Sequence, residues 1–161
     1  MLTPQEISDQ IEIEQVLNRY FRAIDTKNWA LLDSVFAPDA AVHYSTPGEL
    51  KTTYEKMVPV FEMFTESFFF TQHAASQIVI DVDGDSAVSS NSLRAIHVQE
   101  THEGEQNTWV VYGTYRDQLV RTPDGWRIAK RVFQGCLTEG ELLPQDRVKS
   151  FPVPRHLQES P

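Results

Sequence analysis

The sequence has a single cysteine, Cys136, and far fewer basic than acidic side chains. One cysteine cannot form a disulfide within the chain and cannot supply a zinc site built from several thiolates. With 14 lysines and arginines against 23 aspartates and glutamates, the formal net charge is −9. Because this charge repels phosphate backbones and anionic membrane surfaces, neither nucleic acid nor a membrane is an expected partner.

The sequence also lacks long apolar runs. No stretch approaches the ~20 consecutive apolar residues that span a bilayer, and residues 1–6 lack the basic and apolar character of a secretory leader. We therefore expect a cytoplasmic protein. Hydrophobic residues nevertheless make up 40% of the 161 residues, and nine residues are phenylalanine, so a well-packed core is expected.

The first half of the chain has apolar residues at helical spacing, which predicts three helices. Thr3 and Glu6 form a capping-box pattern at the start of the first helix, and Pro4 suits its first turn. Pro59 lies inside the third helix and is expected to bend it. The helices are expected over residues 4–24, 29–36 and 54–64.

The second half alternates between apolar and polar residues and is interrupted by short turns that contain glycine. Strands are expected over residues 40–45, 78–82, 87–98, 109–121 and 126–137. Turns at residues 83–85, 103–105 and 123–125 join the last four strands into an antiparallel meander. Helices followed by such a meander predict an α+β fold, in which a curved sheet wraps the helices.

We expect one domain over residues 1–137 and a C-terminal tail over residues 138–161. The tail contains four prolines and has no clear apolar period. Such a segment is expected to be a lid over the domain, an arm toward another subunit, or a loose end.

Six short motifs occur in an order and spacing typical of a known family. They are Tyr20-Phe21-Arg22-Ala23-Ile24-Asp25 followed by Trp29, Phe36-Ala37-Pro38-Asp39-Ala40, His73 before a strand, Asp83-Gly84-Asp85-Ser86-Ala87, Gly113-Thr114-Tyr115-Arg116-Asp117, and Asp124-Gly125-Trp126-Arg127-Ile128. From about residue 5 to 137 the chain resembles the SnoaL-like branch of the nuclear transport factor 2-like superfamily. The resemblance implies a cone-shaped α+β barrel, with the N-terminal helices packed in a curved, mainly antiparallel sheet around a deep pocket.

The same resemblance implies a set of site residues. The superfamily includes scytalone dehydratase, hexachlorocyclohexane dehydrochlorinase, bile-acid dehydratase, polyketide cyclases and ketosteroid isomerase, and also members without catalysis. In the dehydratase and dehydrochlorinase members, an aspartate that ends the first helix pairs with a histidine at the start of the strand after the third helix. Asp25 and His73 fall on those positions, and Tyr20 matches a tyrosine that recurs in the dehydratases.

These residue types suit an elimination without a metal or cofactor. The imidazole of His73 can take a proton from carbon near neutral pH, and the carboxylate of Asp25 can orient the ring. Tyr20 and Arg131 are possible polarising groups for developing negative charge, and Arg131 could hold an enolate or a carboxylate. The leading expectation is a cofactor-independent dehydratase or cyclase that acts on a hydrophobic, cyclic small molecule.

Four further residues are expected to contact the substrate. Tyr44 and Tyr115 are hydroxyl donors on predicted strands, and Phe133 shares a strand face with Arg131. Phe70 belongs to a run of three phenylalanines that would form a wall of the pocket. Small residues at 74–76 would leave space beside it.

Each of these assignments has a structural alternative. Asp25 could cap a helix, His73 could be a structural histidine, and Tyr20 could pack in the core. His97 and His102 are five residues apart, so on one strand they point to opposite faces and a shared metal ion is not expected. The core is expected to contain Trp29, Phe36 and Trp126.

Two other functions remain open at this point. A ketosteroid-type isomerase would need an inward carboxylate on the sheet, for which Asp117 is the nearest candidate. A ligand-binding or assembly subunit would have no catalysis, and its signature would be a pocket too narrow for a ligand or one in which Asp25 and His73 do not meet. In either case the superfamily resemblance implies a homodimer or homotrimer.

Overall fold

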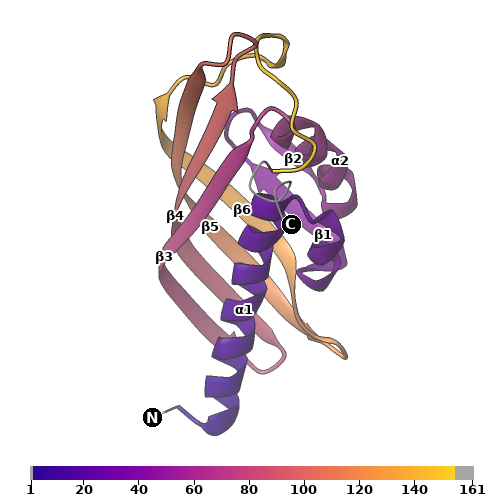
Figure 1. The fold of residues 1–161 in the computed structure, drawn as a ribbon. Helices are drawn as coiled ribbons and strands as arrows, with labels where there is room; N and C mark the ends of the chain where they lie inside the picture. The colour runs from indigo at the N-terminus through magenta and orange to yellow at the C-terminus, as the bar shows by residue number, and fades with distance from the viewer. Residues whose placement is uncertain (1, 155–161) are drawn as a thin grey trace, which may run out of the picture.

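A six-stranded sheet curves around a long N-terminal helix in the computed structural model, which describes residues 2–154 (Figure 1). The strand order is β2-β1-β6-β5-β4-β3, and every neighbouring pair is antiparallel except β1 and β6. The elements are α1 (Pro4–Thr26), the 3₁₀ helix η1 (Trp29–Ser34), β1 (Phe36–Tyr44), β2 (Leu50–Thr53), α2 (Tyr54–Thr65), β3 (Phe70–Asp83), β4 (Ser86–Glu100), β5 (Gln106–Thr122), β6 (Gly125–Gly140) and the 3₁₀ turn η2 (Gln145–Arg147). The expected α+β fold and the meander from β3 to β6 are confirmed.

Local signals at both ends of α1 explain its length. At the start, the Thr3 hydroxyl accepts from the Glu6 amide, and the Glu6 carboxylate accepts from the Thr3 amide at 2.6 Å. At the end, Lys27 has a left-handed backbone (φ 52°), which stops the helix two residues later than expected. One face of α1 is buried against the sheet, including Ile13, Leu17 and other residues at helical spacing.

Three elements near the helices differ from the expectation. The second helix is a 3₁₀ helix and ends at Ser34, before a strand that already begins at Phe36. The pairing of β1 with β6 is irregular between Phe36 and Ala41, so Pro38 lies where the ladder is already interrupted. β2 was not expected, because four residues are too short to show an alternating pattern. Phe36 and Trp126 are core residues as expected, whereas Trp29 is only half-buried.

The expected start of β3 was also wrong. β3 begins at Phe70 rather than at residue 78, because residues 70–76 pair with β4 from Phe70 opposite Val98 onward. The small and polar residues of this segment hide its strand character in the sequence. Gln77, with φ of 53°, forms a bulge that separates this part of β3 from the apolar part that was recognised.

The chain after β6 is attached to the domain. β6 itself continues to Gly140, three residues beyond the expected domain boundary. The buried side chain of Gln99 bonds to both the amide and the carbonyl of Leu143, at 2.9 and 3.0 Å. Further on, Val148 bridges to Thr101, and the Phe151 carbonyl accepts from Lys27 Nζ. The end of the expected tail, residues 155–161, lies outside the described residues.

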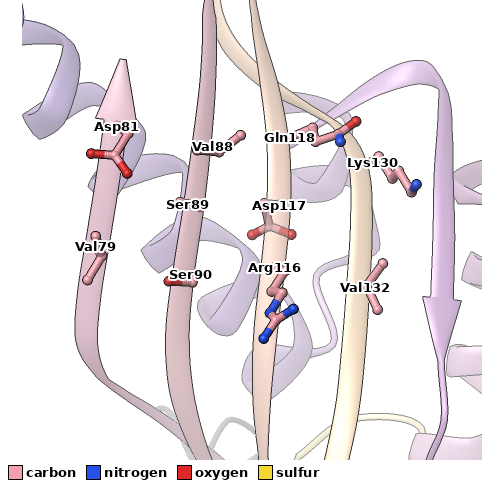
Figure 2. Close-up of a pocket in the computed structure, with 10 residues that line it drawn as sticks. All are labelled: Val79, Asp81, Val88, Ser89, Ser90, Arg116, Asp117, Gln118, Lys130 and Val132. Carbon is pink, nitrogen blue, oxygen red and sulfur yellow. The ribbon is translucent and has the colours of Figure 1, made fainter. Parts of the chain in front are cut away.

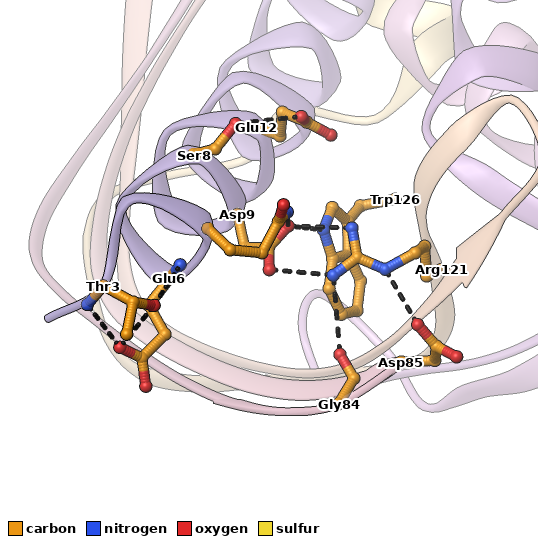
Figure 3. A network of polar contacts seen from close by, with 10 residues as sticks. Thr3, Glu6, Ser8, Asp9, Glu12, Gly84, Asp85, Arg121 and Trp126 are labelled. Carbon is orange, nitrogen blue, oxygen red and sulfur yellow. Dashed lines mark hydrogen bonds and ion pairs between the residues drawn. The ribbon is translucent and has the colours of Figure 1, made fainter.

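A buried carboxylate fastens the N-terminal half of α1 to the hairpin turns of the sheet (Figure 3). Asp9, 2% exposed, accepts two hydrogen bonds of 2.8 Å from Arg121 and one of 3.2 Å from the Trp126 indole. Arg121 also bonds to the exposed carboxylate of Asp85 at 2.9 Å. The Arg121 guanidinium lowers the pKa of Asp9 to about 2.

None of the helices within residues 2–154 has both the length and the apolar character that a membrane span requires.

We expect Asp9→Asn to lower the melting temperature by roughly 5–10 °C at neutral pH, because the neutral amide loses the paired charge. The folded-state pKa of Asp9 is lowered from 3.8, so its contribution is complete above pH 3.8 and is lost as the pH falls toward about 2. The gap between variant and wild type should therefore shrink in acid, measured by circular dichroism. Asp85→Asn is the matched control on the same guanidinium and should melt like wild type. Equal melting of Asp9→Asn and wild type at neutral pH would contradict the assignment.

Candidate active site

A cavity of about 720 Å³ lies between α2, the inner face of the sheet and the chain after β6. Its wall is mostly aromatic and aliphatic. The apolar contributors include Phe61, Phe64, Leu93, Trp109, Val111 and Phe133. Polar side chains form two regions of this wall, around His73 and around Tyr20, and Thr46, Glu49, Thr65 and Gln145 also line the cavity.

The first polar region is a hydrogen-bonded pair of Asp25 and His73. Asp25 lies in the last turn of α1 and His73 near the start of β3, and Asp25 Oδ1 is 2.6 Å from His73 Nδ1. The other carboxylate oxygen accepts from the His73 backbone amide at 2.9 Å. The Thr71 hydroxyl adds a third bond, also of 2.9 Å. The carboxylate therefore fixes both the ring and the backbone of His73.

These contacts determine the charge of Asp25. Burial by itself raises the pKa of Asp25, but the hydrogen bonds and the attraction from His73, with the Thr71 bond, hold it below its ordinary value. The Asp25 carboxylate is therefore ionised at neutral pH. The His73 side chain is 8% exposed and lines the cavity, while its Nδ1 faces Asp25. This arrangement leaves Nε2 as the ring nitrogen not held by Asp25.

A second histidine, His97, lies beside this pair and was not predicted as a site residue. Its ring is 5.5 Å from the His73 ring between centroids and nearly perpendicular to it, and it lines the same cavity. Burial, with repulsion from His73, lowers the pKa of His97 to about 3, so the ring is neutral. Its Nδ1 is buried without a hydrogen-bond partner in the described part of the chain.

The signal that could have identified His97 is alternation along β4. The inward side chains of this strand are Ala87, Ser89, Asn91, Leu93, Ala95, His97 and Gln99, all of them buried. His97 also pairs directly with Thr71, which bonds to Asp25. The pairing of His97 with Thr71 was not expected, because β3 was expected to start at residue 78 rather than at Phe70.

The second polar region is a cluster of three tyrosine hydroxyls. Tyr20 on α1 is 2.9 Å from Tyr44 on β1 and 3.5 Å from Tyr115 on β5, between hydroxyl oxygens. All three side chains line the cavity and are nearly fully buried. Burial raises the pKa of Tyr44 and of Tyr115, so both phenols keep their protons. The cluster is therefore a source of hydrogen-bond donors.

Arg131 points inward but does not reach the cavity, contrary to the role expected for it. Its side chain is fully buried and makes two bonds with Asp117, of 2.8 and 2.7 Å. Its guanidinium stacks on Tyr20 and Tyr115, 4.0 and 4.4 Å from the ring centroids. Burial opposes its charge, but Asp117 outweighs burial and raises the pKa of Arg131. Arg131 therefore packs against the rings of Tyr20 and Tyr115 without lining the cavity, so it does not contact a substrate oxygen there.

Phe70 was expected to contact the substrate, but it does not line the cavity. It shares its strand face with the exposed residues Gln72 and Ala74, whereas Thr71 and His73 point inward. The nearby Phe68 is fully buried in the core, and neither phenylalanine lines the cavity. The aromatic wall comes instead from Phe61 and Phe64 on α2 and from Trp109 and Phe133 on the sheet. The other expected contacts, Tyr44, Tyr115 and Phe133, do line the cavity.

Two loops complete the cavity wall. Residues 46–49, between β1 and β2, line one side, and residues 142–145 after β6 line another. Glu49 is the only cavity-lining residue among residues 2–154 with an aspartate, glutamate, lysine or arginine side chain, and it pairs with Lys51 at 2.8 Å. Within the same residues, no group of three histidine, cysteine, aspartate or glutamate side chains is arranged to hold a metal ion.

Comparison with known proteins relates this chain to one family. A model of the SnoaL-like domain matches residues 5–132. An uncharacterized protein of Mycobacterium tuberculosis strain H37Rv is 37% identical over 138 residues, which cover 84% of this chain and 91% of that protein.

Two solved structures share the fold. One, a Novosphingobium aromaticivorans protein named as a candidate scytalone dehydratase, has a TM-score of 0.73 at 22% identity and covers 92% of this chain and 96% of its own. The other, a hexachlorocyclohexane dehydrochlorinase, has a TM-score of 0.70 at 13% identity and covers 84% of this chain and 90% of its own. At such identities the likeness extends to the fold alone.

We expect the His97 imidazole to stay neutral from about pH 8 to about pH 5, a range in which an ordinary histidine gains its proton. Its pKa of about 3 follows from burial and from His73. Imidazole resonances followed by NMR across this range should include a signal whose shifts do not change, and His97→Gln should remove that signal. Titration of the His97 signal near pH 6.5 would contradict the assigned burial.

Proposed function

Since the chain belongs to the SnoaL-like domain family, we propose that it is a cofactor-independent lyase that dehydrates a hydrophobic, cyclic small molecule, or cyclises one with the same groups. The observation that carries this proposal is the 2.6 Å contact between Asp25 and His73 at the wall of a largely apolar cavity. The names of the two structural neighbours, a dehydratase candidate and a dehydrochlorinase, both denote eliminations, which favours this reaction class.

His73 is the proposed base. With Nδ1 donating to the ionised Asp25, its Nε2 accepts a proton from a carbon next to the one that carries the leaving hydroxyl. The electrons of the broken C–H bond form the new double bond, and the hydroxyl departs with the proton that the imidazolium returns. The products are the alkene and water, and His73 ends neutral. Asp25 stabilises the imidazolium and keeps its own charge throughout.

The tyrosine cluster is the proposed donor for negative charge on the substrate. Its three hydroxyls carry three protons, and the two contacts between them, Tyr20 with Tyr44 and Tyr20 with Tyr115, use two. One proton is therefore available for a carbonyl or enolate oxygen. The Arg131 cation behind the rings of Tyr20 and Tyr115 adds a favourable field without contacting the substrate.

The neutral His97 suits a supporting part in this scheme. A cation at His97 would disfavour the imidazolium that forms on His73, whose ring is 5.5 Å away. Because burial keeps His97 neutral, that penalty is absent. Its ring also offers a polar contact for the leaving hydroxyl, close to the proton that His73 returns.

The isomerase alternative has no support in this geometry. Its expected base, Asp117, uses both carboxylate oxygens to bind Arg131, and its side chain is 1% exposed. It does not line the cavity. The non-catalytic alternative predicts a pocket too narrow for a ligand, or an Asp25 and a His73 that do not meet. The cavity of about 720 Å³ and the contact between the two residues favour a catalytic role instead. A cytoplasmic location and assembly into a homo-oligomer stay predictions.

We expect His73→Ala to lower dehydration by about 10²–10⁴-fold while the melting temperature stays close to that of wild type, because the proton acceptor is lost and the fold is not. Asp25→Asn should also lower the rate, because it removes the charge that stabilises the imidazolium. The assay is a panel of uncharged cyclic β-hydroxy ketones, followed through the absorbance of the conjugated enone. His102→Ala, on an exposed histidine, is the control. Wild-type rates in His73→Ala, or unfolding of that variant, would refute the proposed role.

Tyr20→Phe should lower kcat by about 10–100-fold and change KM little, because the hydroxyl acts on charge that develops in the transition state. Tyr112→Phe is a matched control, since Tyr112 bonds to Glu139 and does not line the cavity. A change confined to KM would mean that the cluster binds substrate without stabilising the transition state.

A further inference from the structure

The opening of the cavity is marked by residues that line it and are also exposed to solvent. They come from three segments: Pro47, Gly48 and Glu49 in the loop between β1 and β2, Val60 and Met63 on α2, and Pro144 and Gln145 after β6. The groups of the proposed reaction lie deeper, since the His73 side chain is 8% exposed and Tyr20 is 1% exposed. A substrate that reacts at His73 therefore has its other end, the distal end, toward Glu49.

Glu49 is the charged residue of this opening. Its side chain is 64% exposed, and its Oε1 is 2.8 Å from Lys51 Nζ and 3.3 Å from His43 Nε2. The hydrogen bond from Lys51 and the charge of Lys51 lower the pKa of Glu49, so the carboxylate is ionised at neutral pH. Lys51 does not line the cavity, so it offsets part of the charge of Glu49 without facing a ligand.

The wall of the cavity offers no cation to an anionic ligand. In the part of the chain that the structure describes, no lysine or arginine lines it, and the cation of Arg131 is already paired with Asp117. Arg116 and Lys130 belong to the same sheet, but they line a separate depression on its opposite face (Figure 2). The ionised Asp25 adds negative charge at the wall. An anionic group in the cavity would therefore be desolvated without a compensating charge.

We infer that Glu49 selects the substrate by charge, so that the site accepts a free molecule with an uncharged distal end and rejects one with an anionic distal end, an assignment that rests on the proposed dehydration at His73. The rejected class includes carboxylates, phosphate and sulfate esters, and thioesters of phosphorylated carriers. Each of these would place negative charge beside the Glu49 carboxylate. A reaction that supplies this substrate must therefore release it from any such carrier first.

The test measures binding, so it does not require turnover. Three probes share a naphthalene ring and a butyl chain and differ in the charge of the terminal group: naphthylbutanamide, naphthylbutanoate and naphthylbutylamine. Their dissociation constants are measured by isothermal titration calorimetry at about pH 8, where an ordinary histidine is neutral. Wild type should bind the amide at least about tenfold more tightly than the carboxylate, and the amine at least as tightly as the amide.

Variants at the two ends of the ion pair should move this preference in opposite directions. Glu49→Gln removes the repelling charge, so it should narrow the preference for the amide over the carboxylate by about fivefold and weaken binding of the amine. Lys51→Gln removes the offsetting charge and should widen the preference by about threefold. Glu12→Gln makes the same change in net charge as Glu49→Gln, on an exposed residue of α1 outside the cavity, and should leave the preference unchanged.

Three outcomes would overturn the inference. Equal binding of the amide and the carboxylate by wild type would show that charge is not selected. A Glu49→Gln variant that shifts all three probes alike would mean that residue 49 shapes the loop and does not act by charge. Failure of every probe to bind at about 1 mM would show that apolar rings do not enter the cavity.

The proposed dehydration fails by a different observation. If His73→Ala keeps wild-type rates while the probe preferences hold, charge selection by Glu49 stands and the proposed role of His73 does not. If the rate falls in His73→Ala but the probes bind without regard to charge, the reaction stands and the charge selection does not.

Discussion

The carboxylate of Asp25 is the constraint on which the rest of the site depends. It lies in the last turn of α1, where the helix dipole disfavours a negative charge, and burial disfavours it further. Three hydrogen bonds from β3 compensate for both costs, two from His73 and one from Thr71. Any rotation or slide of α1 relative to β3 would break them. The charge that orients the imidazole therefore also fixes the helix on the sheet.

That fixed register explains how Tyr20 reaches the cavity. Positions 20 and 25 are about 140° apart around a helix, so on a flat sheet only one of them could face the strands. Here the sheet curves around α1, and Asp25 meets β3 while Tyr20 meets Tyr44 on β1 and Tyr115 on β5. The curvature of the sheet, rather than helical periodicity, joins the two polar regions into one chamber.

The sequence predicts this fold well because its signals are local. The capping box at Thr3, the turns between the strands and the family motifs each depend on a few adjacent residues, and all agree with the structure. The errors concern contacts between residues on neighbouring strands. His97 was missed and Phe70 misassigned because the polar start of β3 gives no strand signal, and both residues depend on its register with β4. Arg131 was expected at the substrate because alternation shows direction but not the carboxylate that already binds it.

An edge strand is an unusual support for the base proposed here, His73, since it has a neighbouring strand on one side only. β3 is held instead by three elements: β4 through its ladder, α1 through Asp25, and the chain after β6 through Phe151, whose ring contacts Phe69 just before the strand. Lys27 connects the last two, because it ends α1 and donates to the carbonyls of Phe68 and Phe151. The segment that looked like a separate tail in the sequence thus belongs to the structure that positions His73.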